Sequence, residues 1–510
     1  MVEPVKGSPT PERELFTMND FDLIIRGGTV VNATHTCEAD VAIRGDKIAA
    51  IGTHLPGSAA RVIDATGRLV MPGGIDTHCH VEQLSGMGKM GADDWYSASV
   101  SAAFGGTTMI VPFAAQHRGN SLRKVADDYA ELARRKSVID YSYHLILSET
   151  DPQTLHTDLP ELIRSGITSF KVYMTYDQLK IDDYQLLDVL AVAARERALV
   201  MVHAENNDVI RWVSQRLLER GYTAPKFHGV SHVALAEAEA THRVIQLSRL
   251  FDVPVMIVHV SAVEALSTIQ AARQIGAQVY GETCPHYLVL TEDDMDLPGT
   301  EGAKYCCSPP LRDAQAQASL WEGLANGTLQ TLSSDHAPYR YDESGKIPYG
   351  DKTTFKQMAN GMPGLEARLP LLFSEGVGGG RLSLQQFVAL SATNHAKMYG
   401  IFPRKGHIAQ GADADIAIWN PEREVTLTVA ALHDQVGYTP YEGRTVKGWP
   451  ETVVSAGRVI VSDGRLDAAP GSGRFIARGV PEPHTVEREI SPRATFFRTL
   501  ALTQEKQKNY

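Results

Sequence analysis

The 510-residue sequence predicts an α/β fold, in which a (β/α)8 TIM-like barrel carries a small β-sandwich domain built from both chain ends. Three observations predict it: apolar runs alternate with helix-like stretches, several of these runs end in a residue that can bind a metal, and short strand patterns with glycine turns occupy both flanks. The predicted regions are an N-terminal extension (1–20), the sandwich (21–68 plus 406–465), the barrel (69–405) and a C-terminal tail (466–510).

Eight apolar runs of strand length follow residue 68, and helix-like stretches separate most of them. The runs are 69–76, 107–113, 142–148, 169–174, 199–204, 253–260, 278–284 and 329–334. The helix-like stretches include 121–136, 184–198, 232–249 and 262–275. Strands that alternate with helices indicate βα units and a parallel sheet. Eight such units in roughly 330 residues fit a (β/α)8 barrel with insertions.

The two flanks carry short alternating strands with glycine turns. Neither 21–68 nor 406–465 makes a convincing closed unit alone, because a few strands leave an apolar face bare. Together they could form one small sandwich, with a helix at 383–398 linking it to the barrel. The tail at 466–510 is rich in proline, glycine and charge, which predicts an extended segment that is either disordered or in contact with a neighbouring subunit.

Two histidines one residue apart follow the first apolar run, in Gly73-Gly-Ile-Asp-Thr-His-Cys-His80. Side chains two residues apart in a strand point to the same face, so His78 and His80 would converge on one point, as a metal site requires. The pair alone is a weak signal in a chain with 18 histidines. Cys79, between them, is expected to point away and pack.

Three later runs end in the same way. His203 ends the run 199–204, His259 ends 253–260, and Asp335 follows 329–334. Any one of these could be a buried histidine or a helix-capping aspartate. The shared placement favours one common site, because the active sites of such barrels lie at the C-terminal ends of the strands.

Lys171 lies in the middle of the fourth run, Ser169-Phe-Lys-Val-Tyr-Met174, and shares a face with Ser169 and Tyr173. A lysine inside a barrel is costly unless it is paired or modified. Burial and nearby cations lower the pKa of a lysine, and a neutral amine can react with carbon dioxide to give an anionic carbamate. The alternative is that Lys171 pairs with a carboxylate inside the barrel.

With these residues, the phrases Ser-Phe-Lys-Val-Tyr-Met-Thr-Tyr176, Val-His-Ala-Glu-Asn206, Gly-Glu-Thr-Cys-Pro285, Ser308-Pro-Pro-Leu-Arg and Asn360-Gly-Met-Pro-Gly364 resemble the hydantoinase/dihydropyrimidinase family of the binuclear-metal amidohydrolase superfamily. The resemblance runs from about residue 20 to about residue 465. It implies two divalent cations per subunit, with zinc expected. The implied ligands are His78, His80 and Asp335 for one ion, His203 and His259 for the other, and Lys171, as N6-carboxylysine, bridging both.

The resemblance also implies an activity, the hydrolytic opening of a dihydropyrimidine or a 5-substituted hydantoin to an N-carbamoyl amino acid. A hydroxide that bridges the metals would be the nucleophile. Asp335 would act as general base and then as general acid. Tyr176 would stabilise the oxyanion, and Ser308 and Asn360 would hold the edge of the cyclic imide, largely through backbone groups.

Several alternatives stay open at this point. Dihydroorotase would require an arginine just after the histidine pair, where Val81 and Glu82 stand instead. Allantoinase or another cyclic imidase of the superfamily is harder to exclude. A non-catalytic assembly homologue fits less well, because all six ligand positions are intact. The Met- and Gly-rich loop after His80 would line the pocket for the ring substituent as a mobile, adaptable wall. The sequence does not indicate which of these substrates, or which stereoisomer, the pocket accepts.

The composition argues against several classes of binding partner. The net charge of −11 and the lack of a basic stripe argue against nucleic acid and anionic membranes. No apolar stretch is long enough to span a membrane, and the N-terminus lacks an apolar export segment. The five cysteines form no CxxC pair, so we expect reduced thiols in a cytoplasmic protein. The family resemblance implies a homo-oligomer, with a tetramer favoured.

Overall fold

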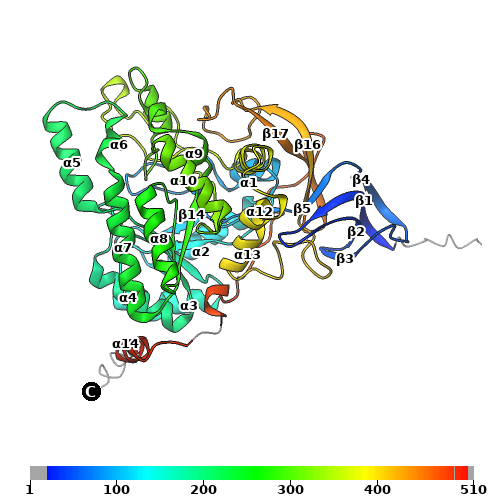
Figure 1. The fold of residues 1–510 in the computed structure, drawn as a ribbon, viewed down its shortest axis with the longest axis horizontal. Coiled ribbons are helices and arrows are strands. Elements are labelled where there is room, and N and C mark those ends of the chain that lie inside the picture. Colours follow the sequence, from blue (N-terminus) through cyan, green and yellow to red (C-terminus); the bar gives the residue numbers. More distant parts are fainter. Residues whose placement is uncertain (1–19, 487–488, 503–510) are drawn as a thin grey trace, which may run out of the picture.

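The computed structural model describes residues 20–486 and 489–502, and it contains a parallel barrel beside a second sheet (Figure 1). All strands of the barrel are parallel within their two hydrogen-bonded groups. They are β6 (Gly74–Asp76), β7 (Thr107–Ile110), β9 (Asp140–Tyr141), β8 (Phe113–Ala115), β10 (His144–Ile146), β11 (Ser169–Tyr173), β12 (Leu199–His203), β13 (Val255–Ile257), β14 (Val279–Thr283) and β15 (Thr331–Leu332). The second predicted strand is divided into β7 and β8, and the third contains only β10, with β9 just before it. The predicted fold class is confirmed.

Helices cover the outside of the barrel, and several of them begin at a capping side chain. The helices α2 and α4 each start after a side chain that accepts a backbone N–H, Ser121 from Lys124 and Asp182 from Gln185. The main helices of the barrel are α1 (Trp95–Phe104), α2 (Leu122–Lys136), α3 (Leu159–Arg164), α4 (Asp183–Glu196), α5 (Asn207–Glu219), α6 (Phe227–Ser231), α7 (Ala234–Phe251), α8 (Val263–Gln274), α9 (Pro285–Val289) and α10 (Ala314–Ala325). The predicted linker helix is realised as α12 (Leu384–Val388), a π-helical stretch and α13 (Asn394–Met398).

The prediction of one continuous barrel strand at 69–76 is wrong, because this run is divided between two sheets. Its first half, β5 (Leu69–Pro72), pairs with β1 and β16 of the second sheet, and only β6 belongs to the barrel. The chain changes sheets at Gly73, where a Cβ atom would lie 2.2 Å from Thr108 Oγ1. An apolar run shows that a segment is buried, but it does not show in which sheet.

The second sheet joins the two flanks of the chain. Its nine strands are β1 (Phe21–Val31), β2 (Thr36–Arg44), β3 (Lys47–Gly52), β4 (Ala59–Asp64), β5, β16 (Ile416–Thr426), β17 (Thr445–Ser455), β18 (Arg458–Ser462) and β19 (Arg465–Leu466). The strand β5 lies between β1 and β16 and connects the two groups. Leu23 and Val41 share one buried apolar cluster with Ile416 and Val454, so each flank covers the other's apolar face.

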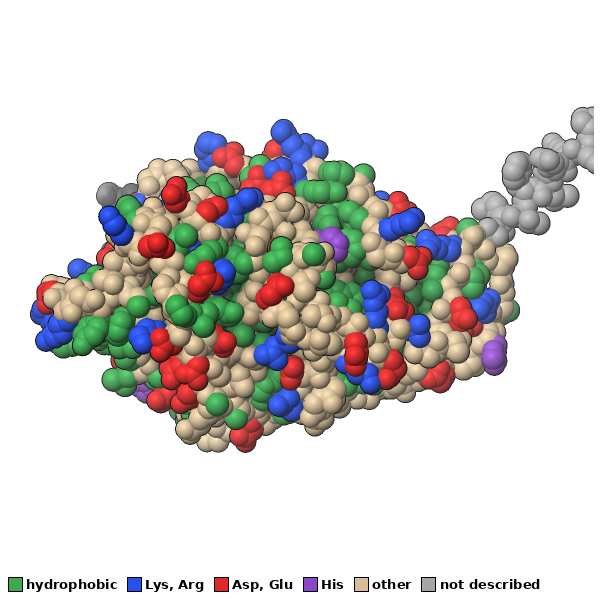
Figure 2. Space-filling view, turned by 90° about the horizontal axis from the view of Figure 1, so that it is seen from above, with side chains coloured by type: hydrophobic (Ala, Val, Ile, Leu, Met, Phe, Trp, Pro, Cys, Tyr) green, Lys and Arg blue, Asp and Glu red, His purple; other side chains and the backbone are tan. Residues whose placement is uncertain are grey.

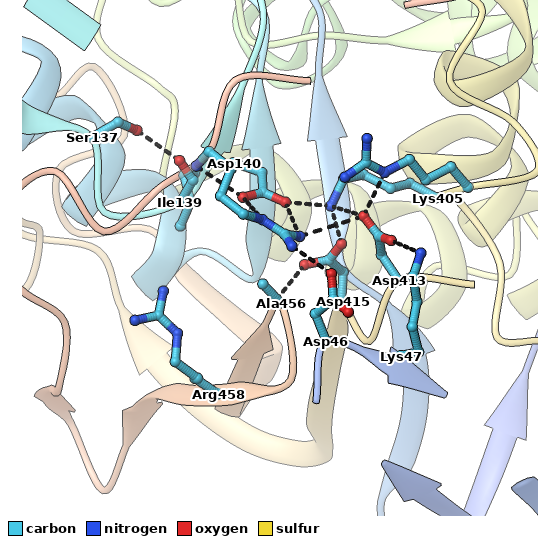
Figure 3. Close-up of polar contacts among 12 residues, drawn as sticks. Asp46, Lys47, Ser137, Ile139, Asp140, Lys405, Asp413, Asp415, Ala456 and Arg458 are labelled. Atoms are coloured by element: carbon cyan, nitrogen blue, oxygen red, sulfur yellow. Dashed lines mark hydrogen bonds and ion pairs between the residues drawn. The ribbon is translucent and has the colours of Figure 1, made fainter. Parts of the chain in front are cut away.

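Lys405 anchors this sheet to the barrel through a buried ionic cluster (Figure 3). Its Nζ lies 2.7 Å from Asp140 of β9 and 3.2 Å from Asp413, and it also contacts Asp415. Burial alone would lower the pKa of Lys405, but these carboxylates more than offset it and raise the pKa. Arg474, from the predicted tail, also donates to Asp140.

Replacing Lys405 with methionine is expected to lower the free energy of unfolding by about 3–5 kcal/mol, because it leaves buried carboxylates without their central cation. Urea unfolding followed by circular dichroism measures the change. Lys397→Met is the control, since Lys397 pairs with Glu482 at 3.7 Å on the surface and should cost no more than about 1 kcal/mol. Equal effects in the two variants would contradict the anchoring role.

Part of the predicted tail packs against its own barrel instead of extending away. Arg478 is buried beneath the barrel and donates to the carbonyl oxygen of Tyr143 at 2.7 Å. The helix α14 (Pro492–Leu502) lies against the barrel helices, where Arg498 donates to the carbonyl oxygen of Phe251 at 2.7 Å. Residues 1–19, 487–488 and 503–510 of the predicted extension and tail lie outside the described residues.

Two surface properties bear on the predicted partners. Figure 2 shows positive and negative side chains interspersed over the face it presents, without a basic stripe. Among the residues that the structure describes, no helix combines the length and the apolar character that a membrane crossing requires.

Candidate metal centre

His78 and His80 converge on one carboxylate just after β6. His78 Nε2 lies 3.1 Å and His80 Nε2 3.3 Å from the same oxygen of Asp335, which follows β15. The backbone reinforces this, because the amide of Asp335 donates to the carbonyl oxygen of His78 at 2.8 Å. The first and last barrel strands thus bring three of the predicted ligands together.

His259 completes a compact group of possible ligands. One ligand atom each of His78, His259 and Asp335 lie within 4.8 Å of one another, and all three side chains are buried. Both ring nitrogens of His259 lack a hydrogen-bond partner within the described part of the chain. Burial, with the nearby His203 and Lys171, holds the pKa of His259 well below its ordinary value, so the ring is neutral. A divalent cation would satisfy such an unpartnered, neutral imidazole.

His203 lies beside His259, with ring centroids 4.5 Å apart. It ends β12, and its Nε2 lies 2.7 Å from a carboxylate oxygen of Glu205. One nitrogen is therefore engaged, which fixes the orientation of the ring and leaves the other nitrogen for a cation.

Lys171 lies in the middle of β11 and points into this group. Its Nζ is 2.9 Å from His78 Nε2, and the side chain is buried. Burial lowers the pKa of Lys171 to about 8, although Asp335 and Glu282 act in the opposite direction. No carboxylate of the described residues lies at ion-pair distance from Lys171. The alternative prediction, an ion pair between Lys171 and a carboxylate inside the barrel, is therefore not supported.

A cavity of about 240 Å³ opens above these side chains. Tyr176, Ser308 and Asn360 line it together with Lys171 and Asp335. Burial raises the pKa of Tyr176 well above its ordinary value, and hydrogen bonds with Ser308 and Asn360 only partly offset this, so the phenol stays protonated. The three residues predicted to contact a substrate are thus grouped beside the candidate metal ligands.

Three residues of the same site have a strained backbone. Tyr176, His259 and Asp335 adopt positive φ angles of 68°, 42° and 46°. Such angles cost a non-glycine residue about 1–3 kcal/mol and persist only where the surrounding structure enforces them. All three of these residues line the cavity.

Comparison with known proteins agrees with this geometry. Residues 69–460 match the model of the amidohydrolase family. The chain belongs to this family. A D-hydantoinase from Geobacillus stearothermophilus is 44% identical over 457 residues, which are 89% of this chain and 96% of the relative. A D-phenylhydantoinase from Escherichia coli is 36% identical over 459 residues, which are 89% of this chain and 98% of the relative.

Solved structures give the same assignment. The crystal structure of dihydropyrimidinase from Brevibacillus agri has a TM-score of 0.87 and 43% identity, over 90% of this chain and 99% of that one. Within the amidohydrolases, the chain is therefore a member of the hydantoinase/dihydropyrimidinase family, and the resemblance read from the sequence is confirmed.

Several partners of the candidate ligand histidines in this amidohydrolase were not assigned from the sequence. Glu282 lies 2.5 Å from His78 Nδ1 and is itself held by Ser333, while Gln83 lies 2.8 Å from His80 Nδ1. The contact of Glu205 with His203 could have been predicted from the sequence, because the two residues are only two positions apart. The contact of Glu282 with His78 could not, because 204 residues separate them.

Three further polar residues fall outside the metal group. Asp76 accepts the backbone amides of His78 and Ser334, so it braces the chain and does not orient a ring. His336 points away from the group and lies 3.1 Å from Asp93. His117 is near the surface, beside the carbonyl oxygen of Leu84.

Proposed function

We propose that this chain is a metal-dependent cyclic amidohydrolase that opens a dihydropyrimidine or a 5-substituted hydantoin to an N-carbamoyl amino acid. The observation that carries the proposal is the convergence of His78, His259, Asp335 and the buried Lys171, of which the last three line one cavity. The relatives' names, D-hydantoinase and dihydropyrimidinase, support the substrate class.

Two divalent cations are proposed to bind in the cavity, with zinc as the metal. His78, His80 and Asp335 would hold one ion, His203 and His259 the other, and Lys171, as N6-carboxylysine, would bridge them. When bound, such ions lower the pKa of water and polarise a carbonyl group. The carbamate is supported by the lowered pKa of Lys171 and by its lack of a carboxylate partner among the described residues.

Asp335 is proposed to transfer the proton. Burial alone would raise its pKa, but His78 and hydrogen bonds from His78 and His80 hold the pKa well below its ordinary value. The carboxylate is therefore ionised and can accept a proton from the attacking water. As the amide C–N bond breaks, the same carboxyl group returns the proton to the leaving nitrogen.

Tyr176 is proposed to donate a hydrogen bond to the oxygen that gains negative charge, while Ser308 and Asn360 hold the ring. Tyr176→Phe is expected to lower kcat about 10²–10³-fold with a smaller change in KM, because the lost bond strengthens in the transition state. Steady-state kinetics measures this. Tyr129→Phe is the control, since that buried phenol donates to the carbonyl oxygen of Val81 outside the cavity. A KM effect alone would contradict the oxyanion role.

The test of the function pairs metal analysis with substrate assays on dihydrouracil, 5-phenylhydantoin, allantoin and dihydroorotate. We expect about two zinc ions per chain and ring opening of dihydrouracil or 5-phenylhydantoin. Two metals without turnover of any of the four would contradict the substrate class. Turnover of allantoin in place of dihydrouracil would favour an allantoinase, which the relatives do not favour. A protein that stays free of metal after expression with metal and bicarbonate would favour the assembly homologue.

The D enantiomer of the hydantoin is the proposed substrate, because the relatives with the higher identities are named D-hydantoinases. Chiral chromatography of the product from racemic 5-phenylhydantoin tests this. Accumulation of the L product would contradict the proposed configuration while leaving ring opening in place.

A cytoplasmic homotetramer is the proposed state. Tyr184, Trp212 and Leu235, on α4, α5 and α7, are 72%, 63% and 68% exposed, and large exposed apolar side chains of this kind favour contact with other subunits. All five cysteines are free, as in a reducing compartment. Light scattering of the purified protein tests the assembly.

A further inference from the structure

A second group of possible ligands shares Asp335 with the candidate metal centre. One ligand atom each of Cys284, His286 and Asp335 lie within 4.8 Å of one another. Cys284 directly follows β14, and His286 lies in α9. Asp335 is thus common to this group and to the candidate metal centre, whereas Cys284 and His286 have no part in the proposed reaction.

The imidazole of His286 carries an unpartnered polar atom. Its side chain is only 2% exposed, yet its Nε2 has no hydrogen-bond partner among the described residues. Most buried polar atoms in proteins are satisfied, so such an atom requires an explanation. Cys284 is fully buried beside it, at 0% exposure.

The donor atoms of this group indicate the chemical class of its ligand. Sulfur, imidazole nitrogen and carboxylate oxygen together suit zinc and softer divalent ions, whereas magnesium and calcium prefer oxygen alone. Asp335 lines the cavity, so an ion could reach the group from there.

We propose that Cys284, His286 and Asp335 bind a third, thiophilic divalent cation, such as Cd²⁺ or excess Zn²⁺, and that this ion inhibits the enzyme. As the metal–sulfur bond forms, the thiol of Cys284 releases its proton to solvent. Asp335 then serves as a ligand of the third ion and no longer accepts the proton of the attacking water. The inhibition rests on the proposed function, but the binding does not.

The test is a titration of the zinc-loaded enzyme with Cd²⁺. We expect a thiolate-to-cadmium charge-transfer absorption that saturates at one ion per chain. Activity should fall in parallel by about 100-fold, the scale of a lost general base. The proposed ligands of the other two ions include no cysteine, so exchange of cadmium for zinc there gives no such absorption.

Variants assign the absorption to a residue. Cys284→Ser should abolish the absorption and the inhibition, each measured against that variant's own activity without cadmium. Cys37→Ser, at an exposed thiol, and Cys306→Ala, at a buried one, should retain both. His286→Gln should weaken cadmium binding at least about tenfold, the lower end of losses at metal sites, and it decides the matter if Cys284→Ser does not fold.

Either of two results would overturn the proposal. One is the absence of charge-transfer absorption at one added equivalent, and the other is absorption that survives in Cys284→Ser and disappears in Cys306→Ala. An enzyme that shows the absorption but hydrolyses none of the test substrates would instead contradict the proposed function and leave the binding site standing.

Discussion

Replacing Lys171 with alanine is expected to remove both the bound metal and the activity. The side chain is buried, lies 2.9 Å from His78 Nε2, and has a pKa lowered to about 8 by burial, so it is prone to carboxylation. Loss of a bridging ligand should cost more than the roughly 10–100-fold that is lost when an outer partner of a ligand is removed. Elemental analysis and ring-opening assays measure the two losses.

Two further observations separate a carbamate from a plain amine ligand. Short carboxylates such as propionate should partly restore metal and activity in Lys171→Ala, and labelled bicarbonate should give a carbamate signal by carbon NMR only in the parent protein. Lys346→Met is the control, because Lys346 is also buried with a pKa lowered to about 8, but it donates to the carbonyl oxygen of Cys306 outside the cavity. Unchanged metal content in Lys171→Ala would refute the bridging role.

Substituting Asp335 with asparagine should lower kcat by about 10²–10⁴-fold, the usual contribution of a positioned general acid or base. The amide keeps an oxygen near His78 and His80 but cannot accept the proton of the attacking water. We therefore expect metal to be retained better in Asp335→Asn than in Lys171→Ala, with a far greater loss of kcat than of metal. Steady-state kinetics on metal-analysed protein measures both.

The control for Asp335→Asn is Asp93→Asn, at a buried carboxylate that lies 3.1 Å from His336 and does not line the cavity. That variant should keep kcat within about tenfold of the parent, since it removes no proton-transfer group. A parallel loss of kcat in both variants would indicate a general effect of buried carboxylates on the fold and would contradict the catalytic role of Asp335.

Local sequence patterns were sufficient for the barrel and for most of the candidate site. Each proposed metal ligand lies in or just after an apolar run. A residue at the C-terminal end of its own strand lies at the active-site end of the barrel, and this position can be read from the local sequence. The alternation of side chains placed Lys171 and Tyr173 on the inner face of β11. Helix starts at Ser121 and Asp182 followed equally local capping rules.

Tertiary structure alone decided which distant elements meet. The run 69–76 is apolar throughout, yet its first half joins β16 of the second sheet, because periodicity reports burial and not the partner strand. Glu282 reaches His78 across 204 residues, and Lys405 meets Asp140 across 265. Cys284, His286 and Asp335 likewise meet only because β14 and β15 are neighbours in the barrel. Such contacts depend on how the barrel closes, and no local spacing encodes that.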